Sequence, residues 1–171
     1  MTYEPLWNAG LAIQLHAWSA FLAFVLGGIV LFRRKGDRLH RLGGRIWVGL
    51  MLSVCISSFF IHTLRVWGIW SPGHLVSIAT LYFLAQGVSQ AWLKRIAEHR
   101  RAMQQTYLGA LVVAGTFTFL PDRVMFEVFF GGPQPWIGVA VALAIVGVSG
   151  WMTWRGMAPP TRKQPKMLAL P

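Results

Sequence analysis

The sequence predicts an all-α integral membrane protein with five transmembrane helices. Of the 171 residues, 55% are hydrophobic and 12% are charged, with a mean hydropathy of +0.52. The apolar residues gather in long segments, and the basic residues lie between alternate segments. About a quarter of the residues of a soluble domain are charged. Half that fraction is too little to cover a domain of this size in water, so a soluble globular protein is excluded.

Five segments are long and apolar enough to cross a bilayer. Crossing takes about 20 mostly apolar residues, because a helical residue rises about 1.5 Å and the hydrocarbon core is about 30 Å thick. The second and fourth segments are the less apolar ones, since Arg45 lies inside one and Gln104 opens the other. The segments run from Ala9 to Phe32, Arg41 to His62, His74 to Leu93, Met103 to Leu120 and Trp136 to Trp154.

The first segment is expected to stay in the protein as a helix. A cleaved signal peptide has a basic start and a short apolar run, whereas here Glu4 and no Lys or Arg precede a long run. The expected organisation is an outer N-terminus (1–8), a four-helix membrane domain with an outer amphipathic segment (9–131) and a fifth helix (132–154). A Pro-rich basic tail (155–171) is expected to be disordered and cytoplasmic.

The basic residues predict the orientation in the membrane. All but two of the 16 Lys and Arg residues lie between the first and second segments, between the third and fourth, or in the tail; Arg65 and Arg123 lie on the other side. Lys and Arg are retained in short cytoplasmic loops, so the N-terminus is expected outside and the C-terminus inside a bacterial inner membrane. The net charge of +11 therefore reflects topology, and a nucleic-acid partner is excluded.

An internal repeat is the next prediction. His16 to Ser19 aligns with His74 to Ser77, and His40 with Arg41 then aligns with His99 and Arg100 after one extra residue. The first two helices thus resemble the next two, so the copies would be related by an axis along the membrane normal. The expected architecture is a four-helix core from a two-helix tandem repeat, with a fifth helix added.

The five histidines form two groups by depth. At about 1.5 Å per residue, His16, His62 and His74 lie about 26–30 Å from the inner basic residues, near the outer interface. His40 and His99 lie among the inner basic residues. Ionisable residues in or beside spanning segments are costly and suggest function.

Three interpretations of these histidines stay open. Paired imidazoles on different helices clamp a b-type haem, with His16 and His74 as an outer pair and His40 and His99 as an inner pair, and this is the leading hypothesis. The second is a copper or zinc ion held by His16, His62 and His74. The third is a structural role, in which each ring hydrogen-bonds to water or to a neighbouring carbonyl.

Five other residues have specific expectations. Arg65 would neutralise an anionic group beside His62, such as a haem propionate or a lipid phosphate, or else anchor the chain at the interface. Cys55 is expected to be a small packing residue, and Trp47 an anchor at the inner interface. Arg123 is expected to pair with Glu127 on an outer helix, because their spacing is i,i+4.

The sequence contains no Gly-rich phosphate loop, HExxH, CxxC or G-x-S-x-G motif, so no catalytic residue is assigned. The runner-up function is a non-catalytic binding or structural protein, such as a metal- or lipid-binding subunit. A small transporter comes third, because proton-driven transport usually needs a carboxylate in the membrane and all five acids lie in loops or at interfaces. Expected partners are the lipid bilayer and a redox partner or further copies of the chain.

The chain resembles a family of small bacterial membrane proteins, domain of unknown function 2306. The resemblance covers about residues 14–131 and rests on ordered blocks: LHAWSAFLAFVLG, HRLGGRIWVGLM, SSFFIHTLRVWG, SPGHLVSIATL, EHRRAM and LGALVVAGTFTFLPDRVMFEVFFG. It implies functional roles for the five histidines and for Arg65 and Arg123, and it implies no particular activity. The family pattern more often reads Pro-Gly-Arg where this chain has Pro121-Asp122-Arg123, so that turn is expected to differ. The similarity to diheme b-type cytochromes is architectural only.

Overall fold

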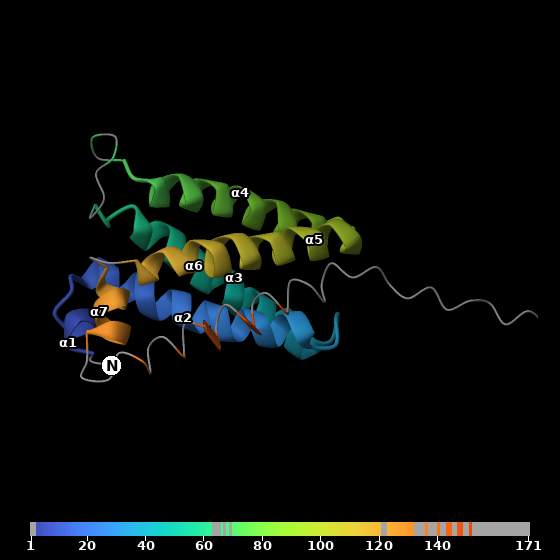
Figure 1. The fold of residues 1–171 in the computed structure, drawn as a ribbon. Coiled ribbons are helices and arrows are strands. Elements are labelled where there is room, and N and C mark those ends of the chain that lie inside the picture. Colours follow the sequence, from blue (N-terminus) through green and yellow to red (C-terminus); the bar gives the residue numbers. More distant parts are fainter. Residues whose placement is uncertain are drawn as a thin grey trace, which may run out of the picture.

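The computed structural model describes residues 3–62, 66, 68, 70–120 and 123–131, together with 136, 140, 143, 144, 147, 148 and 151. These described residues form helices and no β-strand, which confirms the all-α class. Most of the predicted fifth helix, the whole predicted tail and Arg65 lie outside them. Elements along the chain are α1 (Glu4–Trp7), α2 (Leu11–Phe32), α3 (Arg38–Ser58), α4 (Pro72–Trp92), α5 (Ile96–Thr106), the π-helix η1 (Tyr107–Val113), α6 (Ala114–Thr116), the 3-10 helix η2 (Phe117–Phe119) and α7 (Val124–Phe130) (Figure 1).

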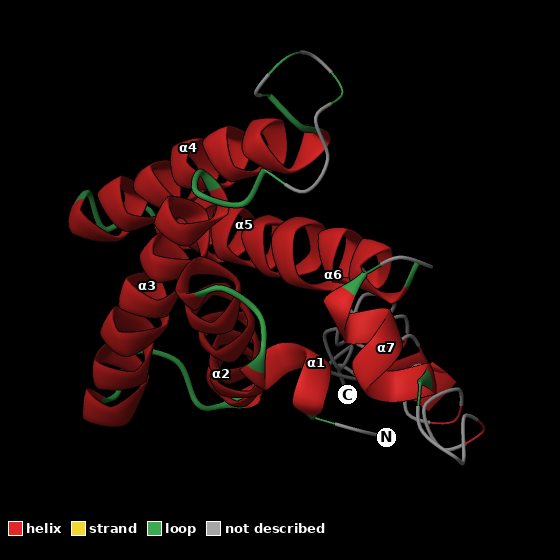
Figure 2. Ribbon diagram, turned by 90° about the vertical axis from the view of Figure 1, so that its left-hand side faces the viewer, coloured by secondary structure: helices red, strands yellow, loops and turns green. Residues whose placement is uncertain are grey.

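Two antiparallel helical hairpins make up the main body. Helix α2 packs against α3, α4 packs against α5, and α3 joins the two hairpins by contacting α4 (Figure 2). The short helices α1 and α7 contact each other at one end of the hairpins. This arrangement places the N-terminal residues of α2 and α4 at the same end of the molecule (Figure 1).

Helices α3 and α5 have boundaries that differ from the prediction. Helix α3 begins at Arg38 rather than Arg41, because the Asp37 side chain caps it by accepting a hydrogen bond from the His40 amide at 2.6 Å. Helix α3 also ends at Ser58, so His62 lies beyond it. Helix α5 begins at Ile96 instead of Met103, which places His99 inside a helix rather than in a loop.

The apolar core lies where α2, α3, α4 and η1 meet. Its buried members are Ala23, Trp47, Met51, Leu84, Tyr107 and Leu111. Trp47 donates its Nε1 hydrogen to the Ala23 carbonyl at 3.0 Å, and the Tyr107 hydroxyl donates to the Phe24 carbonyl at 3.0 Å. The prediction of Trp47 as an interface anchor is therefore wrong, since it is a core residue. Cys55 is buried, as expected of a packing residue.

Gly27 permits this close approach. A Cβ atom at Gly27 would lie 2.5 Å from Trp47 Nε1 and 2.7 Å from the Tyr107 ring. Cβ atoms essentially never approach other heavy atoms that closely, so only glycine lets both rings reach the carbonyls of α2. Tyr107 also opens the π-helix η1, whose extra residue per turn changes the direction of the side chains that follow.

Helix α4 is polar on much of its buried side and apolar on its exposed side, unlike a surface helix of a water-soluble protein. Helix α4 buries His74, Ser77 and Thr80 together with Leu84 and Gly87. Its exposed side chains include Leu75, Val76, Ile78, Tyr82 and Phe83. A helix with a polar buried stripe and an apolar exposed face is suited to lipid.

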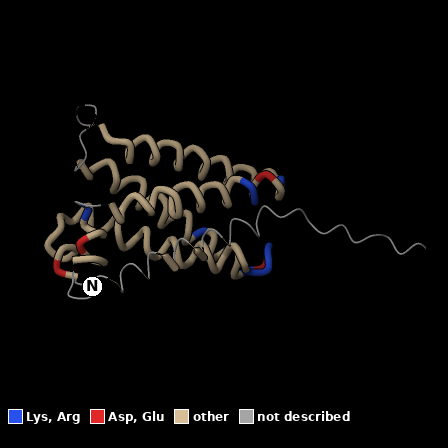
Figure 3. Tube along the Cα trace, viewed as in Figure 1, with Lys and Arg blue, Asp and Glu red and all other residues tan. Residues whose placement is uncertain are grey.

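Two described helices, Leu11–Phe32 and Arg38–Ser58, are long and apolar enough to cross a membrane, or three if Ile96–Phe119 and Val124–Phe130, which meet at 67°, form one span. Helix α4 has 21 residues but does not reach the hydropathy of these spans. Lys and Arg residues gather at the end of the hairpins opposite α1 and α7 (Figure 3). After Gly131, Trp151 stacks on Phe32 with ring centroids 6.1 Å apart.

The outer amphipathic segment is helical, as predicted, but the expected ion pair is not formed. Arg123 is the N-cap of α7, and its carbonyl accepts the Glu127 amide hydrogen at 3.1 Å. Among the described residues, the single ion pair joins Arg33 and Asp37. The predicted pairing of the Arg123 and Glu127 side chains is therefore wrong.

Candidate functional site

The structure separates the five histidines into three settings. At the end of the hairpins where α2 and α4 begin, His74 lies in a group of rings that also contains His62. We call Phe59, His62, Trp70 and His74 the outer cage, after the predicted orientation. His16 faces α3 from α2. His40 and His99 lie at the opposite end of the hairpins and interact electrostatically. We call them the inner pair, again after the predicted orientation.

The outer cage surrounds a buried imidazole. The His74 side chain is 3% exposed. Phe59 stacks parallel to it with ring centroids 5.7 Å apart, Trp70 stands perpendicular at 5.7 Å, and the His62 ring lies 5.5 Å away at 58°. His74 therefore occupies an apolar, aromatic environment.

One nitrogen of His74 has a fixed partner. The Ser71 amide donates to His74 Nδ1 at 3.0 Å, so His74 takes the part that Glu or Gln plays in a capping box at the start of α4. Because Nδ1 accepts a hydrogen bond, the neutral ring carries its proton on Nε2. His74 Nε2 is buried and has no hydrogen-bond partner among the described residues.

This tautomer does not fit a metal or haem iron at His74 Nε2. A ligating nitrogen needs a free lone pair, and the other nitrogen of a ligating histidine normally donates its hydrogen to a carbonyl or carboxylate. His74 has the reverse arrangement. In this structure the predicted outer haem pair of His16 and His74 is therefore not set up for coordination.

His16 belongs to a separate polar network. Its Nδ1 lies 2.9 Å from the Val54 carbonyl and 3.2 Å from Ser57 Oγ. Ser57 in turn donates to the Ser53 carbonyl at 2.6 Å, and the Ser53 and Ser19 hydroxyls are 2.9 Å apart. Such bonds tie α2 to α3 as interhelical contacts in membranes do.

The predicted metal site of His16, His62 and His74 is not assembled. Across the described part of the chain, no three His, Cys, Asp or Glu side chains are close enough to share a metal ion. His62 and His74 are in ring contact, whereas the partners of His16 are on α3. The sequence places the three at one depth but leaves the rotation of each helix undetermined.

The inner pair has the opposite nitrogen chemistry to His74. His99 donates its Nδ1 hydrogen to the Gly87 carbonyl at 2.7 Å, which leaves the lone pair on Nε2. The His40 ring interacts with the Val30 carbonyl, and its Nδ1 is buried without a partner among the described residues. Both rings thus meet a backbone carbonyl of the preceding helix and keep a nitrogen available.

Charged residues surround the inner pair. Burial and the neighbouring Arg100 lower the pKa of Lys35, whose ammonium group donates to the Val30 and Leu31 carbonyls at the end of α2. A hydrogen bond from Arg33, and then one from the His40 amide, hold the pKa of Asp37 below its usual value. The inner end thus combines two imidazoles with Lys35 and Arg100, which repel each other.

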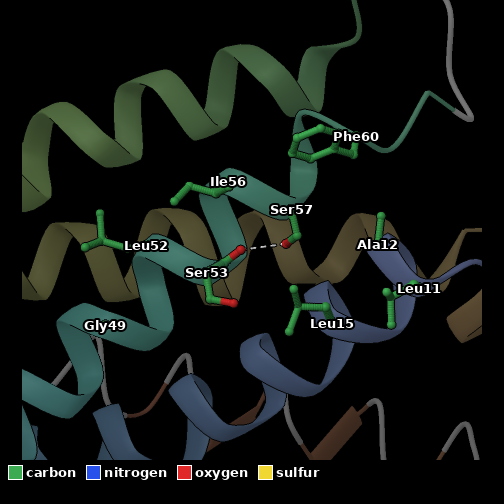
Figure 4. Close-up of a pocket in the computed structure, with 9 residues that line it drawn as sticks. All are labelled: Leu11, Ala12, Leu15, Gly49, Leu52, Ser53, Ile56, Ser57 and Phe60. Atoms are coloured by element: carbon green, nitrogen blue, oxygen red, sulfur yellow. Dashed lines mark hydrogen bonds between the residues drawn. The ribbon is translucent and has the colours of Figure 1, made fainter.

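A groove of about 530 Å³ runs between α2 and α3, on the outer half (Figure 4). It contains two serines among apolar side chains and no titratable group, so it offers no acid, base or ligand. The residues around it are Leu11, Ala12, Leu15, Gly49, Leu52, Ser53, Ile56, Ser57 and Phe60.

Sequence reasoning misses the surroundings of His74. It assigns no site role to Phe59, Trp70 or Ser71, although Ser71-x-x-His74 has the spacing of a capping box. No local sequence pattern predicts that Phe59 and Trp70 contact His74, because this contact depends on how α3 and α4 pack against each other.

A family model for a predicted membrane protein, DUF2306, matches residues 13–154. The match includes all five histidines and both predicted site arginines. Comparisons with curated proteins and with solved structures give no significant match. The apolar exposed face of α4 agrees with the membrane description of that family, and the chain belongs to the DUF2306 family of predicted membrane proteins.

Proposed function

We propose that the chain is a five-span protein of the bacterial inner membrane, with its N-terminus outside and its C-terminus in the cytoplasm. Helix α4 is the third span in this proposal, since its polar stripe is buried and its exposed face is apolar. The α5–η2 run is the fourth, and residues 136–154 form the fifth. The basic residues at one end of the hairpins support the orientation.

The two hairpins are also proposed to be copies of one unit. In each copy the inner histidine reaches back to a carbonyl of the preceding helix: His99 to Gly87, and His40 to Val30. Gly87 and Val30 lie at nearly matching positions in the alignment of the two copies. This correspondence supports the tandem repeat independently of sequence identity.

For function, we propose that the inner pair holds a b-type haem and that the protein transfers electrons at the inner face of the membrane. The observation that carries this proposal is the hydrogen bond from His99 Nδ1 to the Gly87 carbonyl, which fixes the ring and leaves Nε2 as a ligand. His40 supplies the second imidazole from α3. Two protein ligands are enough for haem, because the macrocycle supplies the others.

Haem fits the inner pair better than a bare metal ion. Zinc and copper sites usually take three or four protein ligands, and the described residues contain no such group. Lys35 and Arg100 lie close enough to repel each other, and two carboxylate groups of the ligand would relieve that repulsion. When bound, the haem would supply one-electron chemistry, and the residues of this chain would fix its position and tune its potential.

An absorption spectrum of the purified protein, produced with ample haem, tests this proposal. A bis-histidine haem gives a sharp α band on reduction, and His99→Ala and His40→Ala should each abolish it. His62→Ala is the matched control and should leave it intact, since His62 lies at the other end of the molecule. A colourless wild-type protein, or a band that survives both inner substitutions, would show that the inner pair holds no haem.

A second candidate is a non-catalytic binding protein. The buried and unpartnered Nε2 of His74 favours it, because a donor in this position suits a ligand rather than a redox centre. In this case the protein is colourless and metal-free by elemental analysis. The two candidates use different ends of the molecule, so each can be tested separately.

A further inference from the structure

His74 has one buried hydrogen-bond donor, its Nε2, that lacks an acceptor among the described residues. Its Nδ1 is occupied by the Ser71 amide at 3.0 Å, so the neutral ring must donate through Nε2. That atom is buried, in a side chain 3% exposed, and no described group accepts from it. A buried donor without an acceptor is strongly unfavourable, and a ligand oxygen would remove that cost.

The surroundings of His74 limit the kind of ligand. Three aromatic rings surround His74: Phe59 lies parallel to it, Trp70 meets it edge-on and His62 is tilted. These aromatic surroundings favour a neutral ligand, because burying a charge among apolar rings is costly. A flat aromatic ligand stacks well in such a cage.

Access to the cage is through its least buried members. His62 is exposed, and Trp70 is 47% exposed, so both side chains can move without disturbing the core. The outer cage lies at the first turn of α4, and the proposed topology places this turn at the outer interface of the membrane. A ligand dissolved in the bilayer would reach His74 from there.

We propose that His74 binds a neutral, membrane-soluble aromatic carbonyl compound of the quinone class, by donating its Nε2 hydrogen to a carbonyl oxygen while the ligand ring packs within the outer cage. This assignment replaces metal or haem ligation at His74. It is independent of the inner pair, and it concerns binding rather than electron transfer.

The test compares two probes of equal shape on the full-length protein in nanodiscs. Menadione carries two carbonyl groups, and methylnaphthalene is the hydrocarbon with the same rings and methyl group. After correction for partition into lipid, the wild-type protein should bind menadione about tenfold more tightly, the value expected for one buried hydrogen bond. Equal binding of the two probes would overturn the proposal.

Substitutions then identify the donor. His74→Phe keeps the ring stacking and removes the donor, so the preference for menadione should disappear. His74→Gln keeps the capping acceptor and an N–H donor, so it should retain part of the preference. His99→Phe is the matched control at the inner end and should leave the preference unchanged, whether or not haem binds there.

A direct measurement covers the case in which His74→Phe fails to fold. In protein with ¹⁵N-labelled histidine, menadione should shift the Nε2 resonance of His74 and leave that of His99 in place. An unchanged His74 resonance would overturn the proposal. So would a shift produced by phosphatidylglycerol but not by menadione, since the ligand would then be an anionic headgroup.

Discussion

At the residue scale, Gly27 determines how closely the hairpins pack. Gly27→Ala places a methyl group 2.5 Å from Trp47 Nε1 and 2.7 Å from the Tyr107 ring, and overpacking of this kind costs about 1–3 kcal/mol. Gly49→Ala is the control, since nothing lies within 4 Å of the position that its methyl group would take. Unfolding in graded denaturing detergent should show a loss for the first variant and none for the second. Equal stability of both variants would mean that α2 does not meet Trp47 and Tyr107.

The Tyr107 hydroxyl provides a smaller effect at the same place. Tyr107→Phe removes its hydrogen bond to the Phe24 carbonyl at 3.0 Å and leaves the ring stacked on Phe24, with centroids 5.8 Å apart. Interhelical hydrogen bonds in membranes contribute about 0.6 kcal/mol on average. The same unfolding assay should therefore show a loss of about that size. A loss as large as that of Gly27→Ala would contradict this assignment.

Residue types could be predicted from the sequence, but their partners could not. The histidines stand out in the sequence because ionisable groups are costly near a bilayer. Which nitrogen of each ring is available depends on backbone atoms, such as the Ser71 amide and the Gly87 carbonyl. The prediction for Trp47 is wrong for a related reason: an indole near a helix end suits the interface, and only the packing of α3 against α2 turns it inward.

At the element scale, Asp37 sets the start of α3. Its carboxylate accepts from the His40 amide at 2.6 Å and pairs with Arg33 at 2.8 Å. Asp37→Ala should loosen the first turn and speed hydrogen exchange at the His40 amide. The His40 amide should be better protected in Asp37→Asn than in Asp37→Ala, because asparagine is also a good N-cap. Similar exchange rates in the wild type and the alanine variant would contradict the capping role.

The same contact should depend on pH. The pKa of Asp37 is lowered in the folded protein, first by the Arg33 hydrogen bond and then by the His40 amide. A carboxylate with a lowered pKa stabilises the fold above its unfolded pKa of about 4, and this contribution is lost as the pH falls through the folded pKa. Protection of the His40 amide should therefore decrease in acid. In Asp37→Asn it should not change with pH over that range.

Helices α2 and α4 were predictable because each has about 20 residues without a charge. The boundaries of α3 and the start of α5 could not be predicted, since arginines near a helix end are equally typical of loops. The sequence does indicate where α3 begins, since Asp37 is a good N-cap three residues before His40. The neighbouring basic residues, however, are equally typical of a loop. The π-helix at Tyr107–Val113 has no sequence signature that would predict it.

At the scale of the whole molecule, the outer cage and the inner pair lie at opposite ends of the hairpins, and the proposed topology places them on opposite sides of the membrane. The predicted topology follows from the basic residues, and the hairpin structure places Lys94 at the inner end and Trp70 at the outer end. Sequence could not show which faces of the four helices meet, because helix rotation depends on packing.

Sided labelling of single cysteines in intact cells tests this arrangement most directly. With Cys55 replaced by serine, a cysteine at Trp70 should react with a membrane-impermeant maleimide added from outside. A cysteine at Lys94 should react only after the membrane is opened. If both positions label from the same side, the two sites do not lie on opposite faces and the proposed membrane topology is wrong.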